Sequence, residues 1–338
     1  DDGQQNTAIG HASMALGNVG GSNTAVGGQT LLYVTGNNNT AVGMQASQFL
    51  VGGAYNVSLG IWAARHVNGS ATGNVSLGSG TLMNAKEGAS NADVDYNIAI
   101  GMNALQGGTL AADNDLIGNI AIGYNAFKST GTQNHVGTIA IGYNALTAVT
   151  SGSDNVAVGY QALMDMTTGD KNTAVGYEAL ENCVDGLNNT ALGYQALTAD
   201  AGNNNTGLGY LALRATTGAQ NTAVGMQASH NIGGGANNVS LGMNSLLDVV
   251  DGSQNVAIGS QAIGGTLGTT ADNSSDLIAI GYQALGGNWG NTTLTDNIAI
   301  GTSAMGGAIN GAINCIAIGR ETLDGALTTG ANGTVGIG

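Results

Sequence analysis

Residues that could carry acid–base or metal chemistry are few in this sequence. The four histidines, His11, His66, His135 and His230, occur at unrelated positions, and none has a metal-ligand partner at the usual spacing. We expect them to be loop residues at the surface. A serine–histidine–aspartate order, a phosphate-binding loop and a dinucleotide fingerprint are also missing from any fitting context. These absences predict that the protein is not an enzyme.

Acidic residues form the other candidate group, and calcium is the cation that they could bind. Asp93 and Asp95 are close together in the sequence, and Asp113 and Asp115 flank Asn114. Hard oxygen ligands of this kind can hold Ca²⁺, but the glycine- and aspartate-rich calcium nonapeptide of some parallel β-rolls is missing. Solvated loop acids are therefore the favoured interpretation, and no cofactor is expected.

The overall charge argues against two classes of partner. The 338-residue chain has a formal net charge of −15 and only six lysines and arginines. A nucleic-acid binder needs a basic stripe to displace counterions, and an anionic membrane surface repels an acidic protein. No apolar run approaches the ~20 residues of a transmembrane helix. We therefore expect neither nucleic-acid binding nor membrane insertion.

One glycine-centred unit recurs along the chain, as in residues 189–197, Asn-Thr-Ala-Leu-Gly-Tyr-Gln-Ala-Leu. The glycine occurs in 19 copies, most of them 16 to 18 residues apart. In every copy the residue before the glycine is Ile, Val or Leu, the second before it is Ala, Ser or Gly, and the third before it is Thr, Val or Ile. The fourth before it is Asn in 15 copies, the exceptions being Thr138, Leu277, Cys315 and Thr334. Such regular spacing indicates a repeat architecture.

Each unit predicts one short β-strand. The three residues before the glycine alternate large branched and small side chains, which is a period of two, and β-branched residues favour strands. The unit is too short for a βαβ crossover, so the strands must wind as coils of a solenoid. The sequence thus predicts an all-β, parallel β-solenoid (β-roll) of about 19 short coils, forming one continuous domain over residues 1–338.

Two apolar columns compete for the interior of the predicted coil. We place the Ile/Val/Leu column inside and the Ala/Ser/Gly column against a neighbouring sheet or chain, because small side chains let another backbone approach closely. The reverse arrangement is compatible with the same pattern. Coils this rich in Ala and Gly bury little area per residue, and association would supply the missing burial. A parallel homotrimer is the simplest closed assembly.

The asparagine column has a role of its own. Asn tolerates turn conformations and satisfies nearby backbone groups, and amides stacked in register can also bond to one another along the solenoid. Soluble turn formation alone is the alternative interpretation. The residues assigned to this structural ladder are Asn23, Asn39, Asn97, Asn119, Asn155, Asn172, Asn189, Asn205, Asn221, Asn255 and Asn297.

The two cysteines, Cys183 and Cys315, are not expected to bridge within one chain. They are about eight coils apart in the predicted solenoid, roughly 40 Å at the strand spacing. A disulfide needs Cα atoms within about 7 Å of each other. Buried free thiols are the expected state, although the same cysteine from different chains could meet near a threefold axis.

Longer coils are the expected places for recognition, because insertions leave the stack as loops. Extra residues accumulate near 84–96, 106–118, 264–276 and 286–296. The last of these contains Trp289 among Gly, Asn and Thr, a composition suited to stacking on a sugar ring. Trp289 is therefore the candidate glycan contact, and the alternative is a loop that caps the edge of the core with the indole.

Two further columns of side chains favour packing over ligand binding. Tyrosines directly after the repeated glycine should pack between strands or chains. These are Tyr124, Tyr143, Tyr160, Tyr177, Tyr194 and Tyr210. A short threonine column could suggest an ice-binding solenoid, but it gives way to Val and Ile elsewhere and has no threonine column beside it. Its members are Thr173, Thr190, Thr206 and Thr222.

The repeats resemble those of two families of fibrous surface proteins. Residues 97–101, Asn-Ile-Ala-Ile-Gly, and 155–159, Asn-Val-Ala-Val-Gly, look like the head repeat of trimeric autotransporter adhesins. That resemblance implies a trimeric left-handed parallel β-roll that binds host matrix or cell surfaces. The fuller unit at 172–180 is more similar to repeats of bacteriophage tail-fibre proteins, which often end in a self-cleaving chaperone domain. The repeat here is longer than the adhesin repeat, and no stalk, anchor or chaperone domain is visible.

Together these features predict a structural extracellular fibre shaft on a virion or a cell surface. The favoured form is a phage-type tail fibre whose loops contact a glycan or protein receptor, and the alternative is the head domain of a bacterial trimeric surface adhesin. A depolymerase would need paired carboxylates in a groove, whereas the acids here are scattered over loops. The chain begins without Met and stops at Gly338 within a repeat, so we interpret it as a piece of a longer protein.

Overall fold

The computed structural model divides into two compact units, residues 1–172 and 173–338, and each is described by itself. The expectation of a single domain over residues 1–338 stays a prediction. Among the described residues there is no α-helix. The structure describes residues 5–16, 18–67, 69–85, 93–108, 110, 114–131, 133–247, 249–264, 273–287, 289, 293–328 and 331–338.

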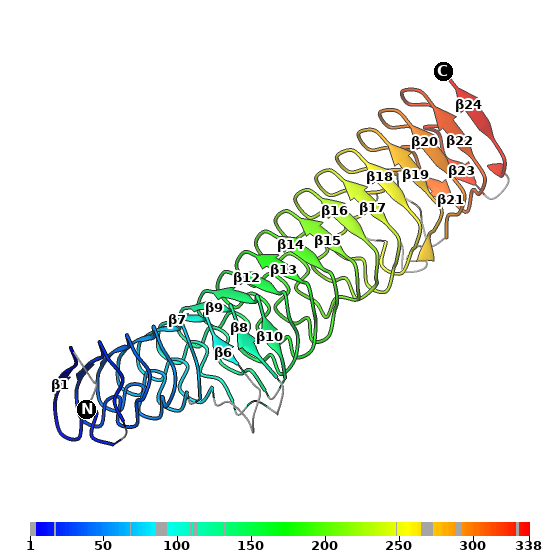
Figure 1. The fold of residues 1–338 in the computed structure, drawn as a ribbon. Coiled ribbons are helices and arrows are strands. Elements are labelled where there is room, and N and C mark those ends of the chain that lie inside the picture. Colours follow the sequence, from blue (N-terminus) through cyan, green and yellow to red (C-terminus); the bar gives the residue numbers. More distant parts are fainter. Residues whose placement is uncertain are drawn as a thin grey trace. The chain divides into compact units, whose positions relative to one another are not determined.

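The first unit is built on a sheet of three-residue strands, one from each copy of the repeat (Figure 1). Each strand pairs in parallel with the strand of the next coil and in register, so that Ala25 lies opposite Ala41 and Val26 opposite Val42. The strands of this sheet are β1 (Thr7–Ile9), β2 (Thr24–Val26), β3 (Thr40–Val42), β4 (Val57–Leu59), β5 (Val75–Leu77), β7 (Ile98–Ile100), β9 (Ile120–Ile122), β11 (Ile139–Ile141) and β12 (Val156–Val158).

A second, smaller parallel sheet occurs where the coils of the first unit are longest. It consists of β6 (Val94–Asp95), β8 (Leu116–Ile117) and β10 (His135–Val136). Within this sheet β8 pairs with both β6 and β10. The described ends of these insertions therefore rejoin the stack.

The second unit repeats the same architecture (Figure 1). Ala174 of its first strand lies opposite Ala191 of the next, again in parallel and in register. The strands of its main sheet are β13 (Thr173–Val175), β14 (Thr190–Leu192), β15 (Thr206–Leu208), β16 (Thr222–Val224), β17 (Val239–Leu241), β18 (Val256–Ile258), β19 (Ile278–Ile280), β20 (Ile298–Ile300), β22 (Ile316–Ile318) and β24 (Val335–Ile337). A two-stranded parallel sheet joins β21 (Ile309–Asn310) to β23 (Leu327–Thr328). The predicted all-β parallel β-solenoid is confirmed in both units.

The glycine that ends each strand is required by close stacking of backbones. Gly142 has a φ of +140°, and a Cβ placed there would lie 2.1 Å from the carbonyl oxygen of Gly159 in the next coil. Gly193 has a φ of +137°, with the carbonyl oxygen of Gly209 at 2.4 Å from the same point. Both the backbone conformation and the lack of space exclude any other residue.

The turn after the glycine contains two left-handed residues, which sequence reasoning did not predict. In one coil these are Gln195, with φ +48°, and Leu197, with φ +53°. The N–H of Gln195 donates to the carbonyl of Tyr177 in the preceding coil at 2.8 Å, and the N–H of Leu197 donates to the carbonyl of Ala212 in the following coil at 3.0 Å. The left-handed conformation costs about 1 kcal/mol or more for such residues, and here it directs two N–H groups to opposite neighbours.

The interior of the coil is the reverse of the sequence interpretation, which placed Ile, Val and Leu inside. The small residue at the strand centre is buried, and the branched residues on either side of it point outward, as in β13, where Ala174 is buried and Thr173 and Val175 are half-buried. Leucine of the turn fills the interior instead: a Cβ on Gly207 would lie 3.2 Å from Cγ of Leu197. Only a small side chain fits opposite that leucine.

The two left-handed positions allow a matched test of this packing. Leu211 (φ +56°) is half-buried and Leu213 (φ +53°) is fully buried in the same turn. Because Asn tolerates the left-handed conformation better than Leu, Leu211→Asn should raise the free energy of unfolding by about 0.5 kcal/mol. Leu213→Asn should lower it by about 3 kcal/mol, because it loses buried apolar contacts. Chemical denaturation of both variants measures the difference, and an equal loss in both would contradict the assignment.

Candidate functional site

The surface of each unit carries a row of outward branched side chains, which we call the outward stripe. It consists of the residues one and three before each repeated glycine, all of them Ile, Leu, Val or Thr in every copy. Leu192 is 42% exposed, Leu208 is 38% exposed and Leu241 is 47% exposed. Neither column contains a charged residue, although the chain carries a net charge of −15. Extended apolar surfaces of this kind mark interaction sites.

Stacked tyrosine rings form a second row of side chains in both units, which we call the tyrosine stripe. The ring centroids of Tyr124 and Tyr143 are 5.3 Å apart in the first unit, and those of Tyr177 and Tyr194 are 5.1 Å apart in the second. The two pairs of planes are inclined by 16° and 7°, so the rings stack. Since neighbouring rings lie face to face, the tyrosine stripe stabilises the stacking of coils.

The asparagine side chains form hydrogen bonds between successive coils. Oδ1 of Asn205 accepts the backbone N–H of Asn221 at 2.9 Å and its side-chain Nδ2 at 3.2 Å. Nδ2 of Asn221 also donates to the carbonyl of Gly235 at 2.8 Å, and its Oδ1 accepts two hydrogen bonds from Asn238. The Asn221 amide thus satisfies the buried backbone N–H of Asn238 and the buried carbonyl of Gly235.

The asparagines chosen from the sequence all lie in this buried column, with exposures of at most 1%. Asn56, Asn74 and Asn238 belong to the same column and make the same contacts. The ladder also tolerates replacement in single coils. Leu277 and Cys315 replace the asparagine, and their backbone N–H groups still donate to Oδ1 of Asn255 and Asn297, respectively, in the preceding coils.

The histidines do not gather in one place. His11 is exposed, and His66 and His230 are half-buried at the surface. His135 is fully buried. The expectation of a surface loop residue is therefore wrong for His135, which lies in β10 opposite Leu116 of β8 and occupies a core position.

Backbone carbonyls surround the His135 ring. Nδ1 lies 3.0 Å from the carbonyl oxygen of Gly152, and Nε2 contacts the carbonyl oxygen of Thr130. The ring also meets Phe127 edge-on, with centroids 5.2 Å apart. Burial lowers the pKa of His135, and hydrogen bonds to the two carbonyls oppose this in part.

The acids considered for calcium are hydrogen-bonded to the backbone. Oδ1 of Asp115 accepts the N–H of Asp93 at 3.1 Å, and Oδ1 of Asp95 accepts the N–H of Thr72 at 2.6 Å. Burial raises the pKa of Asp95 and the carboxylates of Asp93 and Asp115 add to the rise, whereas the bond from Thr72 opposes it. Asp113 lies outside the described residues. In the part of the chain that the structure describes, no three His, Cys, Asp or Glu residues are placed to hold a metal ion.

Both cysteines are free and buried, as predicted. Burial raises the pKa of the Cys183 thiol to about 11. The thiolate is the reactive form of cysteine, and burial disfavours this form of Cys183 at neutral pH.

Trp289 is corrected from a glycan contact to a core residue. Its side chain is fully buried in the same hydrophobic cluster as Leu285, Leu294 and Met305. A buried indole offers no face to a sugar. The alternative interpretation, in which the indole caps the core, therefore describes Trp289. Much of the predicted recognition loops falls outside the described residues: 86–92, 109, 111–113, 265–272, 288 and 290–292.

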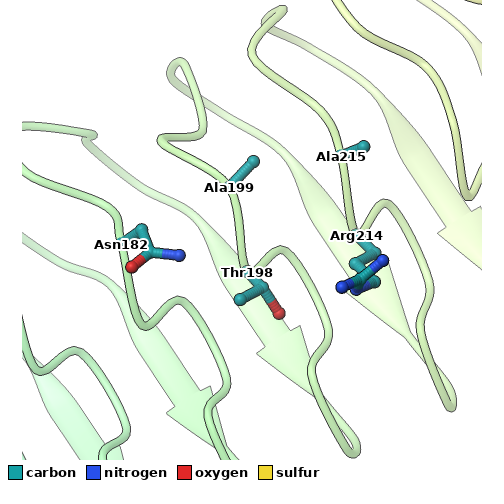
Figure 2. A pocket seen from close by; sticks show the side chains of 5 residues that line it. All are labelled: Asn182, Thr198, Ala199, Arg214 and Ala215. Carbon is teal, nitrogen blue, oxygen red and sulfur yellow. The ribbon is translucent and has the colours of Figure 1, made fainter.

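A shallow depression of about 260 Å³ lies on the turns of three successive coils of the second unit. Figure 2 shows that Asn182, Thr198 and Arg214 follow one another along it, beside the methyl groups of Ala199 and Ala215. The Thr198 hydroxyl already donates to the carbonyl of Gln195 at 2.8 Å. Arg214 is the one charged residue among the five that line the depression, so this lining contains no acid–base pair.

The fold and its columns define an all-β solenoid repeat protein. No protein-family model matches the chain, and no curated protein matches it. Across the described residues, no helix has the length and apolar character needed to cross a membrane.

The ladder predicts a large loss of stability when one amide is removed. Asn221→Leu should lower the free energy of unfolding by about 3 kcal/mol, because it leaves the buried backbone N–H of Asn238 and the carbonyl of Gly235 without partners. Thr217→Leu, a change at an exposed residue outside the outward stripe, serves as the control and should stay within about 0.5 kcal/mol. Equal effects of both substitutions in chemical denaturation would show that the ladder contributes nothing.

The burial of His135 predicts that the free energy of unfolding depends on pH, and a variant without this histidine tests the prediction. Because its pKa is lowered on folding, the unfolded chain binds the proton first as the pH falls through about 6.5. The free energy of unfolding should therefore fall between about pH 7 and pH 5. His135→Leu, which introduces the same residue type as Leu116 opposite it in the adjacent strand, should remove this component. Parallel pH dependences of the wild type and the variant in denaturation experiments would contradict the assignment.

Proposed function

We propose that this chain is a structural segment of an extracellular fibre that assembles as a parallel homotrimer through the outward stripe. The observation that carries the proposal is the absence of charge from both columns of the stripe in every copy of the repeat. A phage-type tail fibre is the proposed form, because the unit at residues 172–180 resembles tail-fibre repeats.

The thin interior of the coils supports association. The strand centres contribute mainly Ala, Ser or Gly, and larger apolar side chains such as Leu180 and Leu197 enter from the turns. Parallel sheets are normally covered on both faces, yet the outer face here is partly exposed. Association through the stripe would bury this face and place the larger aliphatic side chains in a shared core.

Rotational symmetry explains why the association would be parallel. A rotation axis along the stacking direction of a unit brings the same stripe of every chain to the centre, coil against coil. Three sheets that meet in this way close around one apolar axis and leave the acidic loops at the periphery, in contact with water.

The mass of the native particle tests this proposal. Light scattering or analytical ultracentrifugation should give three times the 33.2 kDa mass of one chain. The double variant Leu208→Glu/Leu241→Glu should dissociate the particle into single chains, because it buries charge at the centre of the stripe. Val184→Glu, which changes an exposed aliphatic residue outside the stripe, should leave the trimer intact. A single-chain mass for the wild type would overturn the proposal.

A further inference from the structure

The start of the first unit differs in charge from the rest of the chain. The sequence contains 21 Asp and Glu, but none of them lies between residues 3 and 86. This stretch contains Arg65, next to His66, in a turn that departs from the repeat by also carrying Trp62. A guanidinium in this stretch has no carboxylate of the same coils to neutralise it.

Five polar and aromatic side chains of three successive coils form one connected group, which we call the Trp62–Arg65 cluster. Nε1 of Trp62 donates to Oε1 of Gln45 at 3.0 Å, and Nε2 of Gln45 donates to Oε1 of Gln29 at 2.7 Å. Nε2 of Gln48 reaches the same Gln29 oxygen at 3.3 Å, and Nε of Arg65 donates to Oε1 of Gln48 at 3.0 Å. The indole and the guanidinium are thus held on one surface by a chain of amides.

One side of the Trp62 indole has no stacked neighbour in its column. Trp62 is 40% exposed, and Gly80 occupies the equivalent position in the next coil, where its N–H donates to the carbonyl of Ile61 at 3.0 Å. Around the point where a Gly80 Cβ would lie, only Asn103 Oδ1 and Met83 Sδ approach within 4 Å. Gly80 itself therefore covers none of the indole, and the next side chain of this column is the short amide of Asn103, whose Oδ1 reaches into the space beside Gly80.

The Arg65 guanidinium keeps two donor groups for a ligand. Its Nε is used by Gln48, and no hydrogen bond or ion pair of Nη1 or Nη2 is found within the described ranges. Two N–H groups side by side match the two oxygens of a carboxylate. Half-burial of the side chain strengthens such a contact, and residues 3–86 contain no Asp or Glu to compete for the guanidinium.

We propose that the Trp62–Arg65 cluster binds a carboxylated sugar residue. The indole supplies the flat apolar face on which the C–H groups of a pyranose ring pack, and the two Nη groups of Arg65 supply the fork for its carboxylate. The amides of Gln45 and Gln48 hold both groups in place before the ligand arrives, which lowers the entropy cost of binding. All residues of the Trp62–Arg65 cluster belong to one chain, so this binding site does not require trimer formation.

Trigalacturonic acid and its fully methyl-esterified form are the probes, since they share the sugar ring and differ in charge. Trp62 is the exposed one of the two tryptophans in the chain and Trp289 is fully buried, so intrinsic fluorescence reports on Trp62. We expect the acid to shift this emission and to give a calorimetric binding signal. The ester should bind about tenfold more weakly or worse, and the binding of the acid should weaken with salt.

Two variants test the named residues without disturbing the stack. Trp62→Gln and Arg65→Gln each introduce the residue that occupies the equivalent position of the preceding coil, Gln45 and Gln48 respectively. Each should weaken calorimetric binding of the acid by about tenfold or more. Arg214→Gln removes an exposed arginine of the second unit and should leave binding unchanged.

Three results would overturn the proposal. They are no binding of trigalacturonic acid at millimolar concentration, equal binding by the wild type and both glutamine variants, and equal binding of the acid and its ester. Circular dichroism of each variant establishes that the coils are folded before binding is measured.

Discussion

The in-register stacking of identical residues is the constraint on which the rest of this structure depends. A coil of this length can satisfy only a few backbone groups within itself, so most of them find their partners in the coil before or after it. Strand N–H groups such as that of Thr222 donate to the asparagine carbonyl of the next coil, here Asn238 at 2.8 Å. The turn supplies two further N–H groups in opposite directions through its left-handed residues. Glycine at the strand end is the residue that lets the backbones approach this closely.

The same constraint separates the interior from the surface. Stacking leaves room for an alanine methyl group at the strand centre and a leucine from the turn, and the buried asparagine occupies the remaining corner. Branched side chains beside the alanine must then point outward, where they are half-buried or exposed; Val42 is 39% exposed and Leu192 is 42% exposed. The thin core and the charge-free surface are therefore two consequences of one geometry. Both lead to the proposed association through the outward stripe.

Features that repeat in all or most copies were predictable from the sequence. The strand before each glycine follows from its period of two, and the asparagine column follows from its fixed position. A period of two, however, does not say which of its two faces is inside, and the choice depended on the turn leucine exemplified by Leu197. His135 and Trp289 were missed because each replaces a core residue in a single coil, where no column indicates its burial.

Amide hydrogen exchange of the native protein, followed by mass spectrometry with residue resolution, tests the central claim most directly. Ordinary surface turns exchange quickly. The stacked coil predicts slow exchange in the strands and also at turn residues such as Gln195 and Leu197, whose N–H groups are bonded to neighbouring coils. Rapid exchange at these turn residues, with protection confined to the strands, would contradict the account.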